Sequence, residues 1–143
     1  MGIAYRNSAE LSVAVWVGVI SDEEADEYLA VLAADPDWAK QGRVLTDLTG
    51  LAEESRPSDA RIAHTAEFFR SRMSERTRAM QWAMVADITF EEATRFGEAL
   101  AEEAPRLIVF NDHKSACTWL GVDVVEVQAI IEELRREAEQ SGA

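Results

Sequence analysis

The chain has 143 residues, of which 27 are acidic and 14 are basic, so its formal net charge is -13. This length predicts one domain, and 48% hydrophobic residues are enough to build a core without cross-links, which excludes full disorder. The acidity argues against a nucleic-acid partner, because binding to phosphates requires clustered lysine and arginine side chains.

Cys117 is the only cysteine. An intramolecular disulfide is therefore impossible, and a cysteine-based zinc site would lack ligands. The longest apolar run, from Val13 to Ile20, is far shorter than the ~20 residues of a membrane-spanning helix. Because the N-terminus also lacks a charged and apolar leader, we expect a cytoplasmic protein without a transmembrane segment.

The first half of the chain predicts a hairpin, a helix and a further strand. Ser21 and Glu24 form a capping-box pair at the start of the helix, and Asp35-Pro36 ends it. The predicted strands cover residues 3–6, 12–20 and 43–50, where β-branched residues are frequent.

The second half predicts helices that alternate with strands. Ser58 is a favourable N-cap for a helix whose apolar face includes Ile62, Ala66, Phe69 and Met73. The remaining elements are strands over residues 78–86 and 106–111, a helix from Asp87 and Thr89 to Pro105, a helix over 112–120, and a final helix that begins at Asp123.

This alternation predicts an α/β fold: a single layered domain over residues 1–140, followed by a frayed tail at 141–143. We expect a mostly parallel open sheet of about five strands with helices packed on it. The N-terminal hairpin would add an antiparallel strand at one edge of that sheet.

Three stretches carry a resemblance to a known family. They are "ISDEEADEYLAVL" with the strand that precedes it (18–32), "VLTDLTGL" (44–51) and "LIVFNDHKSACTWL" (107–120). The chain resembles the SpoIIAA-like proteins, small bacterial proteins whose fold is similar to STAS domains and to the CRAL-TRIO lipid-binding fold. The resemblance implies a STAS-like module without enzymatic activity, which recognises partners or holds an apolar, lipid-like ligand.

In STAS domains, partner recognition is regulated by phosphorylation of a serine at a helix N-terminus, so the resemblance points to a regulatory role for Ser58. The STAS motif Asp-Ser-Ser-Gly is absent, and Arg56-Pro57-Ser58-Asp59 is the nearest equivalent by position. Arg56 and Arg61 are candidate anion contacts beside it. They belong to the segment 56–78, which contains six arginines and only three acidic residues. The alternative is that Ser58 only caps its helix and that the arginines pair with acidic side chains elsewhere.

Polar residues follow the ends of several predicted strands. Ligands bind open α/β sheets beside the carboxyl ends of the strands, which predicts a ligand or partner edge. The residues concerned are Asp47, Thr49, Asp87, Asn111 and Asp112. The alternative is that each aspartate caps a turn or a helix. The spacing matches no known metal loop, and we expect neither a metal nor another cofactor.

Large apolar side chains predict either an ordinary core or a pocket for an acyl chain. The pocket hypothesis rests on Phe69, Met73 and Trp82. His113 and Cys117 lie four residues apart, yet no oxyanion loop or third orienting residue accompanies them, so we assign no catalytic residues.

The sequence thus predicts a non-catalytic binding or regulatory module for a protein partner or a small apolar or anionic, lipid-like molecule. The alternative is an enzyme with a carboxylate-lined site at Asp47, Asp87 and Asp112. The amphipathic helix over residues 123–139 is a candidate homodimer face, although its own domain is its default partner.

Overall fold

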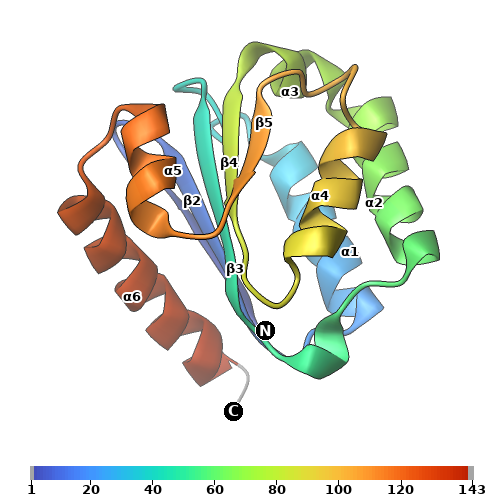
Figure 1. Ribbon diagram of the computed structural model, residues 1–143, viewed down its shortest axis with the longest axis horizontal. Helices are drawn as coiled ribbons and strands as arrows, with labels where there is room; N and C mark the ends of the chain where they lie inside the picture. The colour runs from blue at the N-terminus through green and yellow to red at the C-terminus, as the bar shows by residue number, and fades with distance from the viewer. Residues whose placement is uncertain (1, 142–143) are drawn as a thin grey trace.

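A computed structural model describes residues 2–141 and confirms the α/β fold, with one five-stranded mixed sheet covered by helices (Figure 1). The strands are β1 (Ile3–Asn7), β2 (Ser12–Gly18), β3 (Arg43–Leu51), β4 (Gln81–Val85) and β5 (Leu107–Phe110). The helices are α1 (Asp22–Ala34), the 3-10 turn η1 (Glu53–Ser55), α2 (Asp59–Arg72), α3 (Ser74–Ala79), α4 (Phe90–Ala99), α5 (His113–Leu120) and α6 (Val124–Ser141).

The strands lie in the sheet in the same order as in the chain, β1-β2-β3-β4-β5. β1 pairs with β2 in antiparallel orientation, whereas β2, β3, β4 and β5 are parallel. Crossovers between parallel strands are right-handed as a rule, so adding strands in one direction places every connecting helix on the same face. α1, α2 and α4 accordingly cover one face, and α5 and α6 cover the other (Figure 1).

Side chains along each strand alternate between these two faces. In β4, Trp82 and Met84 belong to the core under α1, α2 and α4, while Ala83 and Val85 belong to the core under α5 and α6. This period of two is the geometry of a pleated strand. Successive residues of a strand therefore contribute alternately to the two cores.

Capping residues start α1, α2 and α5 and end α5 where the sequence predicts, whereas α4 ends at Ala99, well before the predicted Pro105. Ser21, Ser58 and Asp112 each accept a hydrogen bond from the backbone N–H three residues ahead, at the starts of α1, α2 and α5. Gly121 ends α5 in the left-handed region at φ 75°, which glycine adopts without a steric penalty. These local contacts explain why most element boundaries agree with prediction.

The segment after α2 differs from prediction. Met73 is the C-cap of α2 rather than part of it, and residues 78 and 79 lie in the short helix α3 instead of a strand. Tertiary contacts hold α3 in place: Arg76 donates to the carbonyls of Leu32 and Asp35 at the end of α1, and Thr77 donates to that of Glu103. Such distant partners leave no periodic pattern in the local sequence.

Helix α6 packs its apolar stripe against the sheet of its own chain. Val127, Ile131, Leu134 and Ala138 are buried there with Val13 and Val15 of β2. Of the predicted tail, Ser141 is the last residue of α6, and residues 142 and 143 lie outside the described part. None of the helices in residues 2–141 is long and apolar enough to cross a membrane.

Candidate functional site: a cavity beneath three helices

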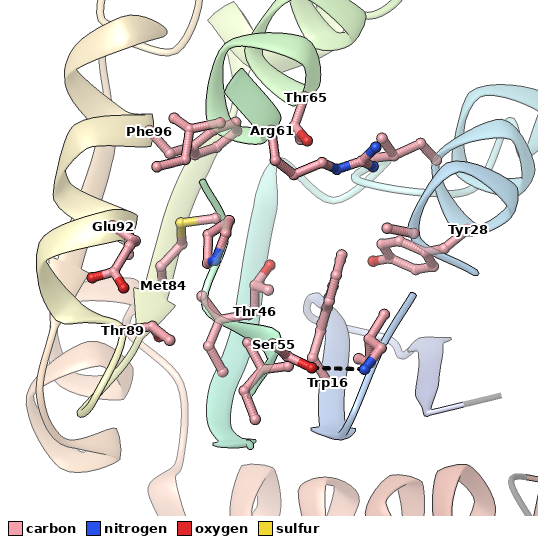
Figure 2. A pocket seen from close by; sticks show the side chains of 18 of the residues that line it. Trp16, Tyr28, Thr46, Ser55, Arg61, Thr65, Met84, Thr89, Glu92 and Phe96 are labelled. Atoms are coloured by element: carbon pink, nitrogen blue, oxygen red, sulfur yellow. Dashed lines mark hydrogen bonds between the residues drawn. The ribbon is translucent and has the colours of Figure 1, made fainter. Parts of the chain in front are cut away.

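A cavity of about 350 Å³ lies between the sheet and helices α1, α2 and α4 (Figure 2). We call it the central cavity. Its floor consists of side chains from β2, β3 and β4, and its roof of side chains from the three helices. Its volume lies within the range of about 300–1,000 Å³ that is typical of small-molecule sites.

Aromatic side chains form much of the cavity wall. Trp38, Trp82, Phe69 and Phe96 pack on one another, with the Phe69 and Trp82 ring centroids 5.0 Å apart. Trp16 and Tyr28 form a second group with an edge-to-face contact at 5.4 Å. These members of the lining are Trp16, Tyr28, Trp38, Phe69, Trp82 and Phe96. Rings held in this way give a stiff apolar surface for a ligand.

The floor near Trp16 is shaped by an irregularity in strand pairing. Val15 pairs with Asp47 but Val17 pairs with Gly50, so β3 has one more residue than β2 in this interval. Gly50 suits this close approach, because an added Cβ atom would make a tight contact of 3.2 Å with the carbonyl oxygen of Trp16. The extra residue bends the strand locally beside Trp16 and Leu48, which both line the cavity.

Two arginines tie the elements at the cavity rim together. Nε of Arg56, in the β3–α2 connection, lies 2.9 Å from the Glu92 carboxylate of α4, and Arg56 also donates to the backbone carbonyl of Ile88. Arg61 of α2 donates to Asp26 of α1 at 2.7 Å. Both arginines line the cavity and both are ion-paired.

Two polar atoms of residues that line the cavity are enclosed by protein and have no hydrogen-bond partner among the residues that the structure describes. They are Nε1 of Trp16 and Oγ1 of Thr89, whose residue is only 1% exposed. Thr89 is the N-cap residue of α4, yet its hydroxyl makes no capping bond. Buried polar groups are almost always paired, so these two atoms are exceptions that a bound molecule could explain.

The structure assigns different surroundings to the three predicted pocket residues. Phe69 and Trp82 line the central cavity together. Met73 is buried in the same core but lies outside the lining, because α2 ends at this residue. Ser58, Arg56 and Arg61, predicted from the chain as a regulatory serine and two anion contacts, all lie at the cavity rim.

Asp47 lies in a buried polar network on the opposite face of the sheet, under α5 and α6. Its side chain is 0% exposed and accepts hydrogen bonds from Arg135 at 2.6 Å and from Thr49 at 2.8 Å; Nε2 of His113 lies 3.0 Å away. Burial by itself would raise the pKa of Asp47. The hydrogen bonds from His113, Arg135 and Thr49 outweigh it and hold the pKa below its usual value.

Of the predicted edge residues, Thr49 hydrogen-bonds to Asp47, whereas Asp87, Asn111 and Asp112 make other contacts. Asp87 and Asn111 line a shallow depression beside the ends of β4 and β5, and Asp112 caps α5 through the Ser115 N–H. Asp47 thus lies enclosed beneath α6, while Asp87 borders the depression and Asp112 caps a helix. In residues 2–141, no group of three or more His, Cys, Asp or Glu side chains could hold a metal ion.

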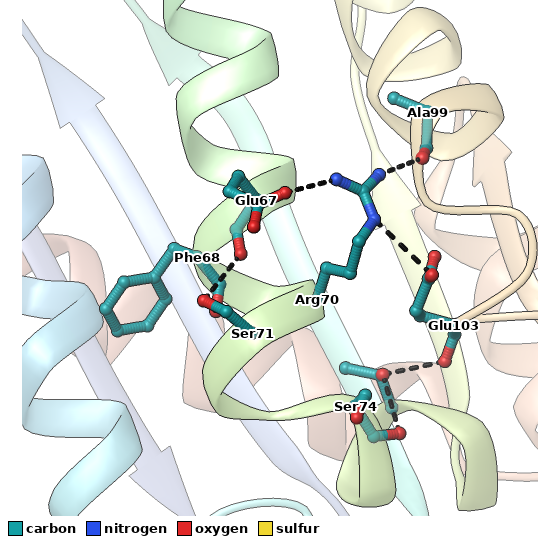
Figure 3. A network of polar contacts seen from close by, with 8 residues as sticks. Glu67, Phe68, Arg70, Ser71, Ser74, Ala99 and Glu103 are labelled. Atoms are coloured by element: carbon teal, nitrogen blue, oxygen red, sulfur yellow. Dashed lines mark hydrogen bonds and ion pairs between the residues drawn. The ribbon is translucent and has the colours of Figure 1, made fainter.

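The arginine-rich segment makes its contacts largely within the chain. Arg70 lies between α2 and the end of α4, where it contacts Glu67, Glu103 and the carbonyl oxygen of Ala99 (Figure 3). Arg72 lies over the Phe68 ring at 5.3 Å from its centroid. Arg56, Arg61 and Arg70 pair with acidic side chains, as in the alternative stated for this segment. Arg76 instead donates to backbone carbonyls at the end of α1, which the sequence did not predict.

Cys117 and His113 do not form a reactive pair. Cys117 is 1% exposed in the core under α5 and α6, and burial raises the pKa of its thiol. Nε2 of His113 faces Asp47. A buried, protonated thiol is a poor nucleophile.

In comparisons with known proteins, no family model and no curated protein matches this chain.

Sequence reasoning missed the partners of Asp47 in its buried network and the partner of Arg56 at the cavity rim. Arg135 and His113 lie 88 and 66 residues from Asp47, and Glu92 lies 36 positions after Arg56. The alternation of side chains along a strand is a local pattern that does bear on the cavity. Trp16 lies two residues after Ala14, and Thr46 two residues after Val44, so both point to the face covered by α1, α2 and α4.

Proposed function

We propose that this protein is a non-catalytic binding module of the SpoIIAA-like type, and that its central cavity binds a small, apolar, lipid-like molecule. The observation that supports this proposal is the cavity itself, with a volume of about 350 Å³ and two groups of packed aromatic rings in its wall. A core of this size usually closes such a space, because empty apolar volume is destabilising.

The geometry of the rim also favours binding. Exposed residues of the β3–α2 connection, among them Arg56 and Ser58, border the cavity, whereas Trp38 and Phe69 at its deep end are almost fully buried. A ligand would thus pass from a polar entrance to an apolar interior. This is the usual arrangement in small-molecule sites, where apolar walls give affinity and a few polar groups give orientation.

An experiment with a neutral fluorescent probe tests the proposal. N-phenyl-1-naphthylamine should bind the wild-type protein and become fluorescent. The change Ala93→Leu, in the cavity wall, should weaken this binding at least about tenfold, because the added atoms occupy the space of the probe. The matched control Ala60→Leu, at an exposed position of α2, should bind the probe as the wild type does.

Absence of probe binding by the folded wild-type protein, or equal binding by the two leucine variants, would contradict a cavity-binding function. Native mass spectrometry of the purified protein adds an independent readout. A co-purified apolar molecule that is lost in Ala93→Leu would support the proposal.

A homodimer stays a prediction. The prediction was based on the apolar stripe of the last helix, and this stripe packs on the sheet of its own chain. Light scattering at two concentrations tests it, and a constant monomer mass would contradict it. A cytoplasmic location, expected from the sequence, stays a prediction, and regulation through Ser58 belongs to the proposal that rests on the SpoIIAA-like resemblance.

A further inference from the structure

The hydrogen-bonding groups on the cavity wall restrict the chemistry of a ligand. Trp16 Nε1 can only donate, and it has no partner among residues 2–141. Oγ1 of Thr89 is also unpartnered, at a residue that is 1% exposed. Thr46 accepts a hydrogen bond from Trp82 Nε1 at 3.1 Å, which leaves its own hydroxyl hydrogen for another acceptor. Three residues of the lining therefore carry a donor hydrogen that no described residue accepts, and the Trp16 and Thr89 atoms concerned are enclosed by protein.

These three donors come from separate elements that surround the same space. Trp16 belongs to β2, Thr46 to β3, and Thr89 is the N-cap residue of α4. Figure 2 shows their side chains around the cavity, with the Tyr28 hydroxyl directed toward it from α1. A molecule in the cavity would lie against these three residues, two on the floor and one at the N-terminal end of α4.

The charged groups at the rim argue against an anionic ligand. The lining contains two arginines, Arg56 and Arg61, and three acids, Asp22, Glu54 and Glu92. Arg56 is already bound to Glu53 and Glu92, and Arg61 to Asp26. A carboxylate or phosphate would have to displace these partners and would enter a lining in which acids outnumber arginines.

We infer that the central cavity selects an uncharged, apolar molecule that carries a hydrogen-bond-accepting oxygen, such as a ring ketone or an ester, with Thr89 and Trp16 as the residues that recognise this oxygen. This inference rests on the proposed binding function and deepens it. An unpaired buried donor is costly, so an acceptor that satisfies it contributes affinity that a hydrocarbon of the same shape cannot supply. The ligand class is thus defined by donors without partners rather than by charge.

Three probes of similar shape separate the possibilities: 9-fluorenone, which has a neutral carbonyl, fluorene, which is a hydrocarbon, and fluorene-9-carboxylate, which is an anion. Their dissociation constants can be measured by displacement of N-phenyl-1-naphthylamine. We expect fluorenone to bind about tenfold more tightly than fluorene, the size of one buried hydrogen bond, and the carboxylate to bind most weakly.

Two conservative variants assign this preference to residues. Thr89→Val and Trp16→Phe keep most of the side-chain volume but remove the donor, and each should reduce fluorenone affinity about fivefold or more without changing fluorene affinity. Thr118→Val and Trp119→Phe are matched controls outside the cavity lining, on α5, and should change neither.

The results distinguish failure of this inference from failure of the proposed function. Equal binding of fluorene and fluorenone, with no effect of Thr89→Val, would overturn the donor-based selection while leaving an apolar binding cavity. Tightest binding of the carboxylate would overturn the choice of an uncharged ligand. If none of the three probes displaces the reporter from the folded protein, both the inference and the cavity function fail.

Discussion

Arg135 of α6 places Nη2 2.6 Å from Oδ2 of Asp47 in β3, although 88 residues separate them in the chain. Asp47 is fully enclosed, whereas the Arg135 side chain is 35% exposed. The pair therefore fastens the C-terminal helix to the middle of the sheet. Nη2 of Arg135 also donates to the Thr49 hydroxyl, and His113 of α5 supplies the second side of the carboxylate.

Loss of the Asp47 charge should destabilise the protein. Asp47→Ala leaves Arg135 and His113 without their shared partner, and we expect the free energy of unfolding to fall by about 3 kcal/mol, as when one member of a buried pair is removed. Urea denaturation checks this. The exposed control Asp37→Ala should change the free energy of unfolding by less than about 0.5 kcal/mol. Equal, small effects would show that the network contributes little.

Asp47 should also make stability depend on acidity. Its pKa in the folded protein lies below the usual value of 3.8, so between these two pKa values the unfolded chain binds more protons than the folded protein. Lowering the pH through this window then favours unfolding, and the contribution is complete above about pH 5. Wild type should lose more free energy of unfolding than Asp47→Asn between about pH 5 and about pH 2. Parallel pH profiles for the two proteins would contradict this assignment.

The ion pair between Arg56 and Glu92 should control the rate of ligand exchange. It ties the β3–α2 connection to α4 at the rim of the cavity, and Glu92 is only 8% exposed on its side chain. We expect Arg56→Met to speed dissociation of N-phenyl-1-naphthylamine several-fold in stopped-flow measurements. The control Arg6→Met removes an exposed contact with Glu133 of α6, outside the cavity lining, and should leave the rate unchanged. Identical rates for both variants would argue against a gate at Arg56.

Ser58 should contribute to stability as the N-cap of α2. Its hydroxyl accepts the Arg61 N–H at 3.1 Å, so Ser58→Ala should lower the free energy of unfolding by about 1 kcal/mol. Ser58→Asp keeps an acceptor and places a negative charge at the helix N-terminus, and should retain most of this stability. If Ser58→Ala changes probe binding or partner capture without changing stability, the regulatory role is favoured over simple capping.

Cys117 should report on opening of the α5–α6 side of the protein. It is 1% exposed, and burial raises the pKa of its thiol, so iodoacetamide should label it only when this region opens. Asp47→Ala should accelerate labelling, because the network that fastens α6 is lost. Fast labelling of the folded wild type would contradict the described burial.

Much of the fold was predictable from the sequence because local interactions encode it. Ser21, Ser58 and Asp112 cap helices by contacts within three residues, and β-branched runs form β2 and β3. The short helix α3 was not predictable, because it depends on the carbonyl groups of α1 and of Glu103. As neighbours in β3, Thr46 and Asp47 were predictable to point to opposite faces of the sheet. Only the tertiary structure shows which helices cover each face.

By itself, the sequence determined an acidic α/β chain and the order of its strands and longer helices, and it singled out Phe69 and Trp82, which line the cavity. The tertiary structure decided that Asp47 is enclosed with Arg135, His113 and Thr49 as its partners. It also decided that the donors of Trp16 and Thr89 lack partners beside one cavity. The physical reason is the separation of the interacting residues along the chain. Helix caps and strand alternation act over a few residues, whereas polar networks and cavities form between side chains that only packing brings together.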